Sequence, residues 1–161
     1  MRVFFDTEFS EEFAESGRAE YIIVPISIGL VREDGEELYL QWEEWEGVQD
    51  RETWIGQHVL PLLDSTSFAS LDTIRTRVKQ FAGVEPEWWG YYCDYDWVLL
   101  CQLYGGMMRL PSGWPMFCRD LKQHIVTLGI EPPEQAGVEH HALVDARWIK
   151  SAWEDVEHRR P

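Results

Sequence analysis

The chain has 161 residues, a length that suits one domain, because a single hydrophobic core commonly serves roughly 100–200 residues. Its formal net charge of −15 at pH 7 argues against a protein that grips nucleic acid through a general basic surface. Bound divalent cations can reverse the field inside an acidic pocket, so chemistry on phosphodiesters stays open.

Cysteine usage and hydropathy indicate the compartment. Cys93, Cys101 and Cys118 are odd in number and lack the paired C-x-x-C spacing of zinc or redox sites, so reduced thiols are expected. The N-terminus has no basic segment followed by a signal-type apolar stretch, and no run approaches the roughly 20 apolar residues that span a bilayer. We therefore expect a cytoplasmic protein with no membrane contact.

The first third of the chain predicts three sequential strands. "RVFFDTEF" alternates apolar and other residues and is followed by a polar loop over 10–20. "YIIVPISIGLV" is β-branched, and its Pro25 predicts a bulge or an unpaired stretch. In "EDGEELYLQW", Asp34 and Gly35 are typical of a two-residue hairpin with a type I′ turn.

The remaining elements are mostly helical. Apolar residues predict helices over 52–63, with Pro61 disturbing the last turn, and over 71–82, with Ser70 and Gly83 as caps. A strand over 87–93 precedes a helix from Asp94 to about 105, and further helices are expected over 117–128 and from 142 onward. The order β-β-β-α-α-β-α-α-α favours one α/β domain over residues 1–161, with a mixed central sheet flanked by helices.

Two acids interrupt the first strand. Asp6 and Glu8 share one strand face, where neighbouring side chains lie about 6.5–7 Å apart, at roughly 3.3 Å rise per residue. This separation suits a pair of divalent cations, which lie about 3.5–4 Å apart in phosphodiester sites. A solvated strand face is the alternative, and the short D-x-E pattern alone does not decide between the two.

A third acid follows the strand over 87–93. Asp96 lies three residues before Leu99 and seven before Leu103, so it falls on the buried face of the predicted helix. Asp94 competes for the same role but is better explained as an N-cap. Asp96 has its own structural alternative, since acids in a first helical turn complement the helix dipole.

The last helix carries the fourth acid. Asp145 lies three residues after Ala142 and four before Ile149, on an apolar stripe where an unpaired carboxylate is costly. His140, five residues earlier, can approach the same pocket, where a neutral imidazole could accept a proton from water. The adjacent His141 remains an alternative from the residues alone.

Together these motifs resemble the DEDDh 3′-5′ exonuclease superfamily, which has an RNase H-like fold. The resemblance rests on D-x-E in "FFDTEF", Y-D in "DYDW" and H-x-x-x-x-D in "HHALVD". The spacing in the third motif selects His140 over His141, and the second motif selects Asp96. The segments "PISIGLV", "YDWVLLCQLYG", "FCRDLKQ" and "HALVDAR" are similar to the polyadenylate-specific 3′-exoribonuclease family.

The resemblance implies a metal-dependent 3′-5′ exoribonuclease that releases nucleoside 5′-monophosphates from the RNA 3′ end. It implies that two Mg²⁺ or Mn²⁺ ions bind to four acids, with a histidine as general base. The implied ligands are Asp6, Glu8, Asp96 and Asp145, and the base is His140. A homodimer is left open.

Substrate contacts are expected beside these acids. Thr7 and Phe9 flank the D-x-E pair, and Phe9 is a candidate for stacking on the terminal base, with core packing as its alternative. Arg119 and Lys122 are candidates for phosphate contacts, although most such charges are merely solvated. The loop over 10–20 and the acidic segment "EEWEGVQDRE" depart from the family pattern and bear on substrate access.

Other functions fit the residues less well. A 3′-5′ exodeoxyribonuclease of the same fold is the nearest alternative, and a catalytically silent nucleotide- or nucleic-acid-binding module would leave a complete set of acids unused. An RNase H-type endonuclease fits the D-x-E spacing less well. A two-carboxylate glycosidase would leave Asp96, His140 and Asp145 without roles.

Overall fold

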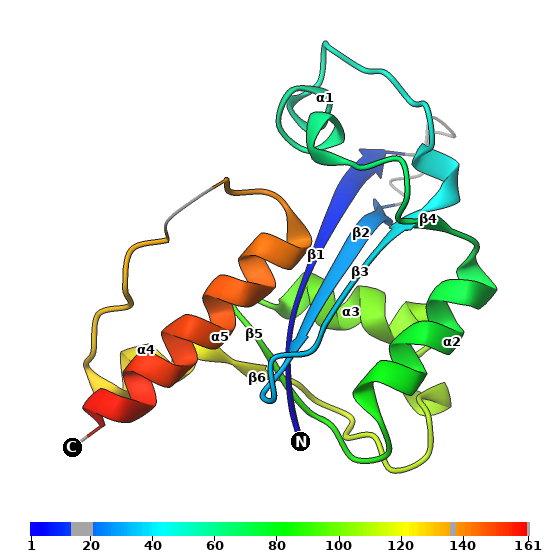
Figure 1. Ribbon diagram of the computed structural model, residues 1–161. Coiled ribbons are helices and arrows are strands. Elements are labelled where there is room, and N and C mark those ends of the chain that lie inside the picture. The colour runs from blue at the N-terminus through cyan, green and yellow to red at the C-terminus, as the bar shows by residue number, and fades with distance from the viewer. Residues whose placement is uncertain (14–20, 136–137, 161) are drawn as a thin grey trace.

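A six-stranded mixed sheet forms the centre of the molecule in a computed structural model, which describes residues 1–13, 21–135 and 138–160 (Figure 1). The strand order is β4-β3-β2-β1-β5-β6. The long strands β1 to β3 pair antiparallel, whereas β5, β6 and β4 each lie parallel to their neighbours. The strands are β1 (Arg2–Phe13), β2 (Tyr21–Arg32), β3 (Glu37–Trp42), β4 (Phe68–Ala69), β5 (Glu87–Gly90) and β6 (Arg119–Asp120).

Helices cover both faces of this sheet. The α-helices are α1 (Trp54–His58), α2 (Leu71–Ala82), α3 (Asp94–Leu103), α4 (Leu121–Leu128) and α5 (Ala142–Arg159). Short 3-10 segments are η1 (Glu43–Trp45), η2 (Leu60–Leu62) and η3 (Met107–Arg109). Helices α2 and α3 lie on one face and α4 and α5 on the other (Figure 1), and α1 lies near the second half of β1. Within the described parts of the chain, none of these helices combines the length and apolar character needed to cross a membrane. The predicted α/β fold with a mixed central sheet is confirmed.

Alternate side chains of β1 belong to two hydrophobic clusters, one on each face of the sheet. Val3 and Phe5 are fully buried in the cluster beneath α2 and α3, while Phe4 is buried in the cluster beneath α4 and α5. Side chains of a strand point alternately to the two faces. Asp6 and Glu8 therefore continue the Phe4 face, towards α5, and Thr7 continues the face towards α3.

Several local predictions are confirmed. Helix α2 begins after Ser70, whose hydroxyl accepts a hydrogen bond from the Thr73 N–H, and it ends before Gly83, whose φ is +75°. Helix α5 begins at Ala142. The β1–β2 register shifts between Glu8 and Phe9, and Phe9 lies opposite Pro25, so the proline does mark an irregular stretch.

The turn between β2 and β3 differs from the prediction. The hairpin exists, but residues 33–36 form its loop, and of these only Gly35 has a positive φ, +93°. A type I′ turn requires a positive φ at both central residues. Asp34 instead accepts hydrogen bonds from the Arg32 side chain and the Glu36 N–H, which stabilises the longer loop. The polar loop expected over 10–20 is also wrong at its start, since β1 continues to Phe13; residues 14–20 lie outside the described part.

Other boundaries differ because of backbone constraints. The helix expected over 52–63 is only α1, followed by η2, since Pro61 cannot donate an N–H to a continuing helix. Strand β5 ends at Gly90, three residues early, because Tyr92 has a φ of +53°. The helix expected from 117 begins at Leu121, after the unpredicted strand β6, and Asp120 caps it. Asp94 is the first residue of α3 rather than its cap, which is Cys93.

Candidate active site

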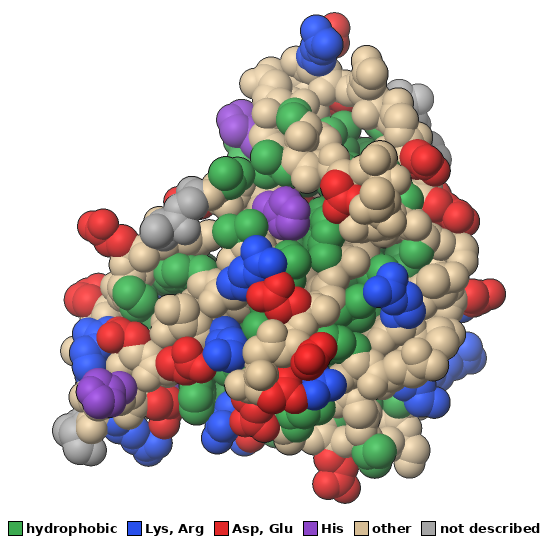
Figure 2. All heavy atoms as spheres, in the orientation of Figure 1, with side chains coloured by type: hydrophobic (Ala, Val, Ile, Leu, Met, Phe, Trp, Pro, Cys, Tyr) green, Lys and Arg blue, Asp and Glu red, His purple; other side chains and the backbone are tan. Residues whose placement is uncertain are grey.

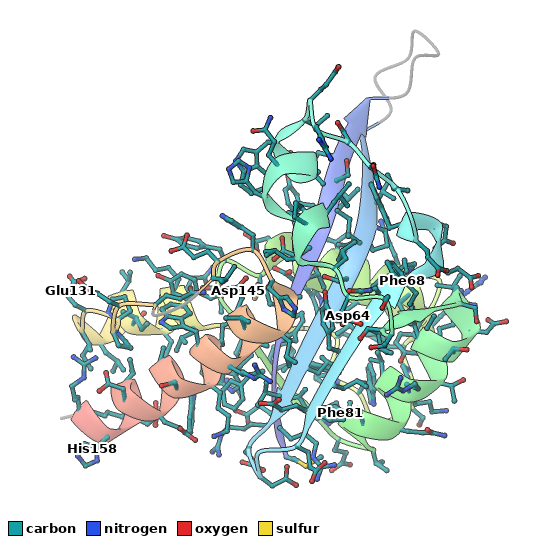
Figure 3. The ribbon with its side chains drawn as sticks, turned by 45° about the horizontal axis from the view of Figure 1, so that its top comes forward. Asp64, Phe68, Phe81, Glu131, Asp145 and His158 are labelled. Atoms are coloured by element: carbon teal, nitrogen blue, oxygen red, sulfur yellow. The ribbon has the colours of Figure 1, made fainter. Side chains whose placement is uncertain are left out.

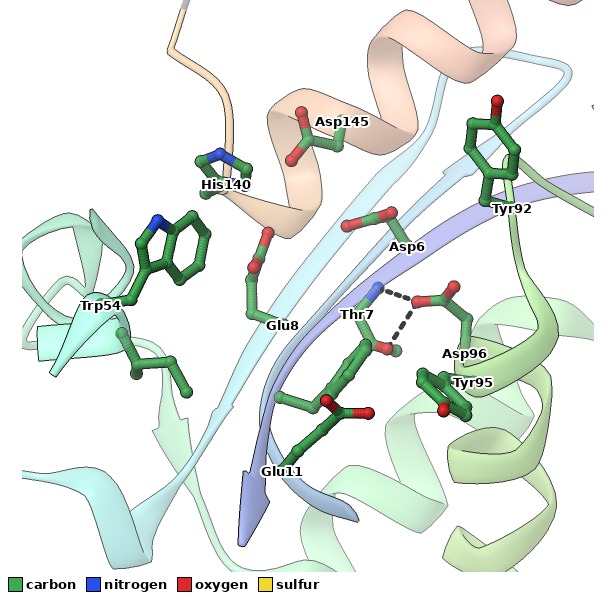
Figure 4. Close-up of a pocket in the computed structure, with 12 residues that line it drawn as sticks. Asp6, Thr7, Glu8, Glu11, Trp54, Tyr92, Tyr95, Asp96, His140 and Asp145 are labelled. Atoms are coloured by element: carbon green, nitrogen blue, oxygen red, sulfur yellow. Dashed lines mark hydrogen bonds between the residues drawn. The ribbon is translucent and has the colours of Figure 1, made fainter. Parts of the chain in front are cut away.

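A pocket of about 540 Å³ opens beside the middle of β1, where Asp6 and Glu8 lie (Figure 4). Its walls come from β1, α1, the turn before α3, and the start of α5. Acids and aromatic residues dominate the lining, and none of the lining residues that the structure describes is a Lys or Arg. The lining residues are Asp6, Thr7, Glu8, Phe9, Glu11, Trp54, Ile55, Tyr92, Tyr95, Asp96, His140 and Asp145.

Three carboxylates converge in this pocket. Asp6, Glu8 and Asp145 each offer an oxygen, and these oxygens lie within 4.8 Å of one another. Asp145 lies in the first turn of α5 (Figure 3), and the Asp6 and Glu8 side chains point towards this turn (Figure 4). Strand alternation and the position of Asp145 in the first helical turn thus bring together acids that are far apart in the sequence.

Gly29 allows α5 to come this close to the sheet. It lies opposite Asp6 in the β1–β2 register. A Cβ atom at Gly29 would lie 2.3 Å from the backbone of Ala142 and Leu143. Only a glycine permits such an approach of two backbones. The start of α5, and with it Asp145, therefore depends on the missing side chain of a strand residue.

Two donors hold the Asp145 carboxylate. The Gln135 amide donates to Oδ1, and the backbone N–H of His141 donates to Oδ2 over 3.1 Å. Both donors precede α5 in the sequence. The loop that brings His140 to the pocket therefore also orients Asp145.

Asp96 reaches the pocket from the other face of the sheet. It is only 6% exposed, and its Oδ1 accepts two hydrogen bonds from Thr7, one from the N–H over 2.8 Å and one from the hydroxyl over 2.6 Å. Figure 4 shows these bonds fastening α3 to β1. Asp96 thus lines the same pocket but lies outside the set of three converging carboxylates.

The two adjacent histidines take different directions. His140 lines the pocket and has a left-handed backbone, with a φ of +67°. His141 stacks instead on Tyr39, with ring centroids 4.4 Å apart and planes at 27°. Among the described residues that line the pocket, His140 is the one histidine.

Crowded acids in a buried site hold their protons more tightly. Burial raises the pKa of Glu8 to about 8, and repulsion by Asp145 and Asp96 adds to the effect. Burial also raises the pKa of Asp6 well above its usual value, with further contributions from Asp96, Glu8 and Asp145. The pKa of Asp96 rises to about 6 because of burial, which its hydrogen bonds from Thr7 partly offset. Burial raises the pKa of Asp145 as well.

The donor set fits a divalent cation. Carboxylate oxygens are the ligands that Mg²⁺ and Mn²⁺ prefer, and a bound cation would remove the mutual repulsion that raises these pKa values. Three converging carboxylates, with Asp96 beside them, supply these donors without any sulfur ligand.

Of the predicted substrate residues Thr7, Phe9 and Arg119, two line the pocket and one lies elsewhere. Thr7 and Phe9 line the pocket, and the Phe9 ring lies edge-on against Tyr95 with centroids 5.5 Å apart. Arg119 does not line it. Because β6 pairs with β5, Arg119 lies beside Trp89, and its Nε lies 3.4 Å from a Glu87 carboxylate oxygen.

Residues without a recognisable motif complete the walls. Trp54 and Ile55 come from α1, in a segment whose sequence carries no catalytic pattern, so no sequence signal points to them. Tyr92 and Tyr95 also line the pocket. Tyr95 belongs to the Y-D element, and that neighbourhood is the one signal that could have identified it.

Known structures share this fold. The zinc-bound complex of Escherichia coli exonuclease I with single-stranded DNA superposes with a TM-score of 0.67 at 14% identity, over 99% of this chain and 41% of that chain. Exonuclease I of Methylocaldum szegediense gives 0.64 at 18% identity, over 99% and 41% of the two chains. The chain thus spans about two fifths of these larger proteins. The chain therefore has the fold of these exonucleases, with an acidic pocket set into it.

The sequence comparison narrows this class. The family model of the Rv2179c-like 3′-5′ exoribonuclease domain matches the sequence over residues 1–156. The chain belongs to this family. It is 38% identical over 156 residues to the 3′-5′ exoribonuclease Rv2179c of Mycobacterium tuberculosis H37Rv, covering 91% of this chain and 88% of the relative. The 3′-5′ exoribonuclease MT2234.1 of strain CDC 1551 matches to the same extent. The predicted membership of the 3′-5′ exonuclease superfamily is confirmed.

Proposed function

We propose that this protein, as a single domain over residues 1–161, is a metal-dependent 3′-5′ exoribonuclease that releases nucleoside 5′-monophosphates from the 3′ end of RNA. The observation that carries the proposal is the convergence of Asp6, Glu8 and Asp145 within 4.8 Å, beside His140, in one pocket. The names of the two mycobacterial relatives support RNA as the substrate.

Asp6, Glu8 and Asp145 would hold divalent cations, with Asp96 completing a site for two Mg²⁺ or Mn²⁺ ions. When bound, the ions would stabilise the negative charge that develops on the phosphate and on the departing 3′-oxygen. Thr7 holds Asp96 by two hydrogen bonds, and Gln135 with the His141 N–H holds Asp145. These hydrogen bonds therefore direct the carboxylates of Asp96 and Asp145 before any ion binds, which is what a preorganised site requires.

His140 would accept the proton of the attacking water. An imidazole is suited to this step because its ordinary pKa lies near neutrality. His140 lies at the rim of the pocket opposite Asp96, close to Asp145 and Glu8 (Figure 4). Its neighbour His141 is occupied by its stack on Tyr39.

The described part of the pocket lining offers aromatic rings that can stack on nucleobases, and no Lys or Arg side chain for phosphate groups. Phe9, Tyr95 and Tyr92 supply aromatic surfaces, and base–aromatic stacking contributes roughly 1–3 kcal/mol per base. On the face seen in Figure 2, basic side chains are mixed with acidic ones rather than gathered into a patch. We propose the RNA 3′ end and the monophosphate product as partners. A cytoplasmic location, which free cysteines suit, and a homodimer remain predictions.

The test compares matched substrates. RNA and DNA of one sequence, each labelled at the 5′ end, are incubated with Mn²⁺ or Mg²⁺ and with wild-type, Asp6→Asn or His140→Ala protein. We expect a ladder that shortens from the 3′ end of the RNA with the wild type and a loss of at least 100-fold with either variant.

The controls separate the alternatives. An RNA blocked by a 3′-phosphate should be degraded more slowly than one with a free 3′-hydroxyl if the chain acts from that end. Internal cuts would indicate an endonuclease, and a ladder on DNA alone would indicate an exodeoxyribonuclease. Equal activity in wild type and Asp6→Asn would reject the proposed site.

A further inference from the structure

A tryptophan on α1 faces the proposed general base. The rings of Trp54 and His140 lie with centroids 4.7 Å apart and planes at 80°, an edge-to-face arrangement. Figure 4 shows Trp54 at the pocket wall directly beside His140. Trp54 is 54% exposed. So large an exposed apolar side chain gains little from core burial, and its position at this wall calls for another explanation.

The Trp54 ring also contacts a second histidine. It stacks on His58, with centroids 4.7 Å apart and planes at 16°. The His58 Nδ1–H donates a hydrogen bond to the Trp54 carbonyl oxygen over 2.8 Å. Two aromatic contacts thus hold the indole, one to His58 and one to His140, and they restrict the directions in which it can turn.

Helix α1 is short, yet its start is fixed by local contacts. The Thr53 hydroxyl accepts a hydrogen bond from the Gly56 N–H over 3.1 Å, and Asp50 accepts from the N–H groups of Glu52 and Thr53. A Cβ atom at Gly56 would lie 1.8 Å from the Asp50 carbonyl oxygen, so the helix packs tightly on the preceding loop. These contacts fix the start of α1, which carries Trp54 at the edge of the pocket.

His140 has few other constraints on its ring. Within residues 1–13, 21–135 and 138–160, no hydrogen bond from a described side chain reaches the imidazole. A general base is normally oriented by a third group that hydrogen-bonds to it. Its positive φ also places it in a backbone conformation that costs energy and persists only when the surroundings enforce it.

We propose that Trp54 is a positioning residue for His140, holding the imidazole towards the carboxylates by edge-to-face contact. The inference rests on the proposed function, because it concerns the base of that reaction. The acids that share the pocket with His140 are Asp6, Glu8, Glu11, Asp96 and Asp145, and His58 stacks on the Trp54 ring. Trp54 acts through geometry and contributes no proton.

A double-mutant cycle tests this role. Single-turnover rates on 5′-labelled RNA with Mn²⁺ are measured for wild type, Trp54→Leu, Trp54→Phe, His140→Ala and the Trp54→Leu/His140→Ala double variant. We expect Trp54→Leu to lower the maximal rate about tenfold with KM within about twofold, and Trp54→Phe, which keeps an aromatic ring, to restore most of the rate. In the His140→Ala background, Trp54→Leu should cause no further loss.

The matched control is Phe117→Leu, which removes an exposed aromatic ring (57% exposed) outside the pocket and should leave the rate unchanged. Equal losses from Trp54→Leu in both backgrounds, or a rise in KM alone, would overturn the inference and indicate direct RNA contact. Wild-type rates with Trp54→Leu would overturn it too. An inactive wild-type protein would reject the proposed function itself, whereas an active wild type with additive losses rejects only the role of Trp54.

Discussion

Thr7 donates two hydrogen bonds to one oxygen of Asp96, from its N–H over 2.8 Å and from its hydroxyl over 2.6 Å. Both residues are buried, with 5% and 6% exposure. The bonds join the strand that carries two of the site's acids to the helix that carries a third. Asp96 is thus directed by the residue that lies between Asp6 and Glu8 in the sequence.

Replacing Thr7 with Val should loosen Asp96. The variant keeps the N–H donor and the side-chain volume but removes the hydroxyl, and a buried hydrogen bond to a charged group contributes about 1.5–3 kcal/mol. We expect the Mn²⁺ concentration for half-maximal activity to rise about tenfold, measured by titrating the ion in the RNA assay. Thr7→Ser retains the hydroxyl and should stay near wild type. An unchanged Mn²⁺ requirement in Thr7→Val would show that the bond does not direct Asp96.

Replacing Gly29 with Ala should displace the start of α5. The added Cβ would meet the backbone of Ala142 and Leu143 at 2.3 Å, so helix and sheet must separate. We expect the free energy of unfolding to fall by about 1–3 kcal/mol and activity to fall with it, because Asp145 moves away from Asp6. Urea denaturation and the RNA assay measure the two effects.

Gly129→Ala is the matched control for that substitution. It adds the same methyl group at a position with nothing within 4 Å, so the cost comes from its φ of +67° alone and is about 1–2 kcal/mol. Activity should be retained. Full activity and stability in Gly29→Ala would contradict the close approach of α5.

The metal-free protein should lose stability as pH rises. The pKa of Glu8 is about 8 in the folded protein and 4.5 when unperturbed. Between these values the folded state binds a proton that the unfolded state has released, so the free energy of unfolding falls as pH increases across this window. Below pH 4.5 Glu8 is protonated in both the folded and the unfolded state, so it no longer lowers the free energy of unfolding. Thermal melting in EDTA from pH 5 to pH 8 would measure the slope.

Divalent cations should reverse this dependence. Mn²⁺ or Mg²⁺ binds the deprotonated carboxylates of the folded state, so the increase in melting temperature should be larger at pH 8 than at pH 5. Glu8→Gln removes one titrating group and should flatten the slope in EDTA. Equal melting with Mn²⁺ and with EDTA at pH 8 would contradict metal binding at this site.

Replacing either of the two neighbouring histidines, His140 and His141, with alanine should affect the reaction rate very differently. His140→Ala removes the proposed general base and should lower the rate about 10²–10⁴-fold. His141→Ala removes only the stack on Tyr39, and its backbone N–H still binds Asp145, so the rate should stay within about fivefold of wild type. Single-turnover assays of both variants measure the two rates. A larger loss of rate in His141→Ala than in His140→Ala would show that His141, not His140, is the general base.

The sequence by itself determined the secondary structure wherever a local pattern was long or strongly capped. Alternation in residues 2–9 predicted β1 and the shared face of Asp6 and Glu8, and the helical stripe predicted α2 and α5. Short elements were not predictable, because strands of two residues such as β4 and β6 are defined by their pairing partners rather than by their own residues.

The sequence also identified the acids, their motifs and the family, since D-x-E, Y-D and H-x-x-x-x-D are local spacings. Only the tertiary structure decided which groups meet. It placed Arg119 beside Trp89 and outside the pocket, and it brought Trp54 to His140, 86 residues further along the chain. Such contacts depend on strand order and on one glycine, Gly29, that lets α5 approach the sheet. These are properties of packed backbones, and no pattern within a single segment encodes them.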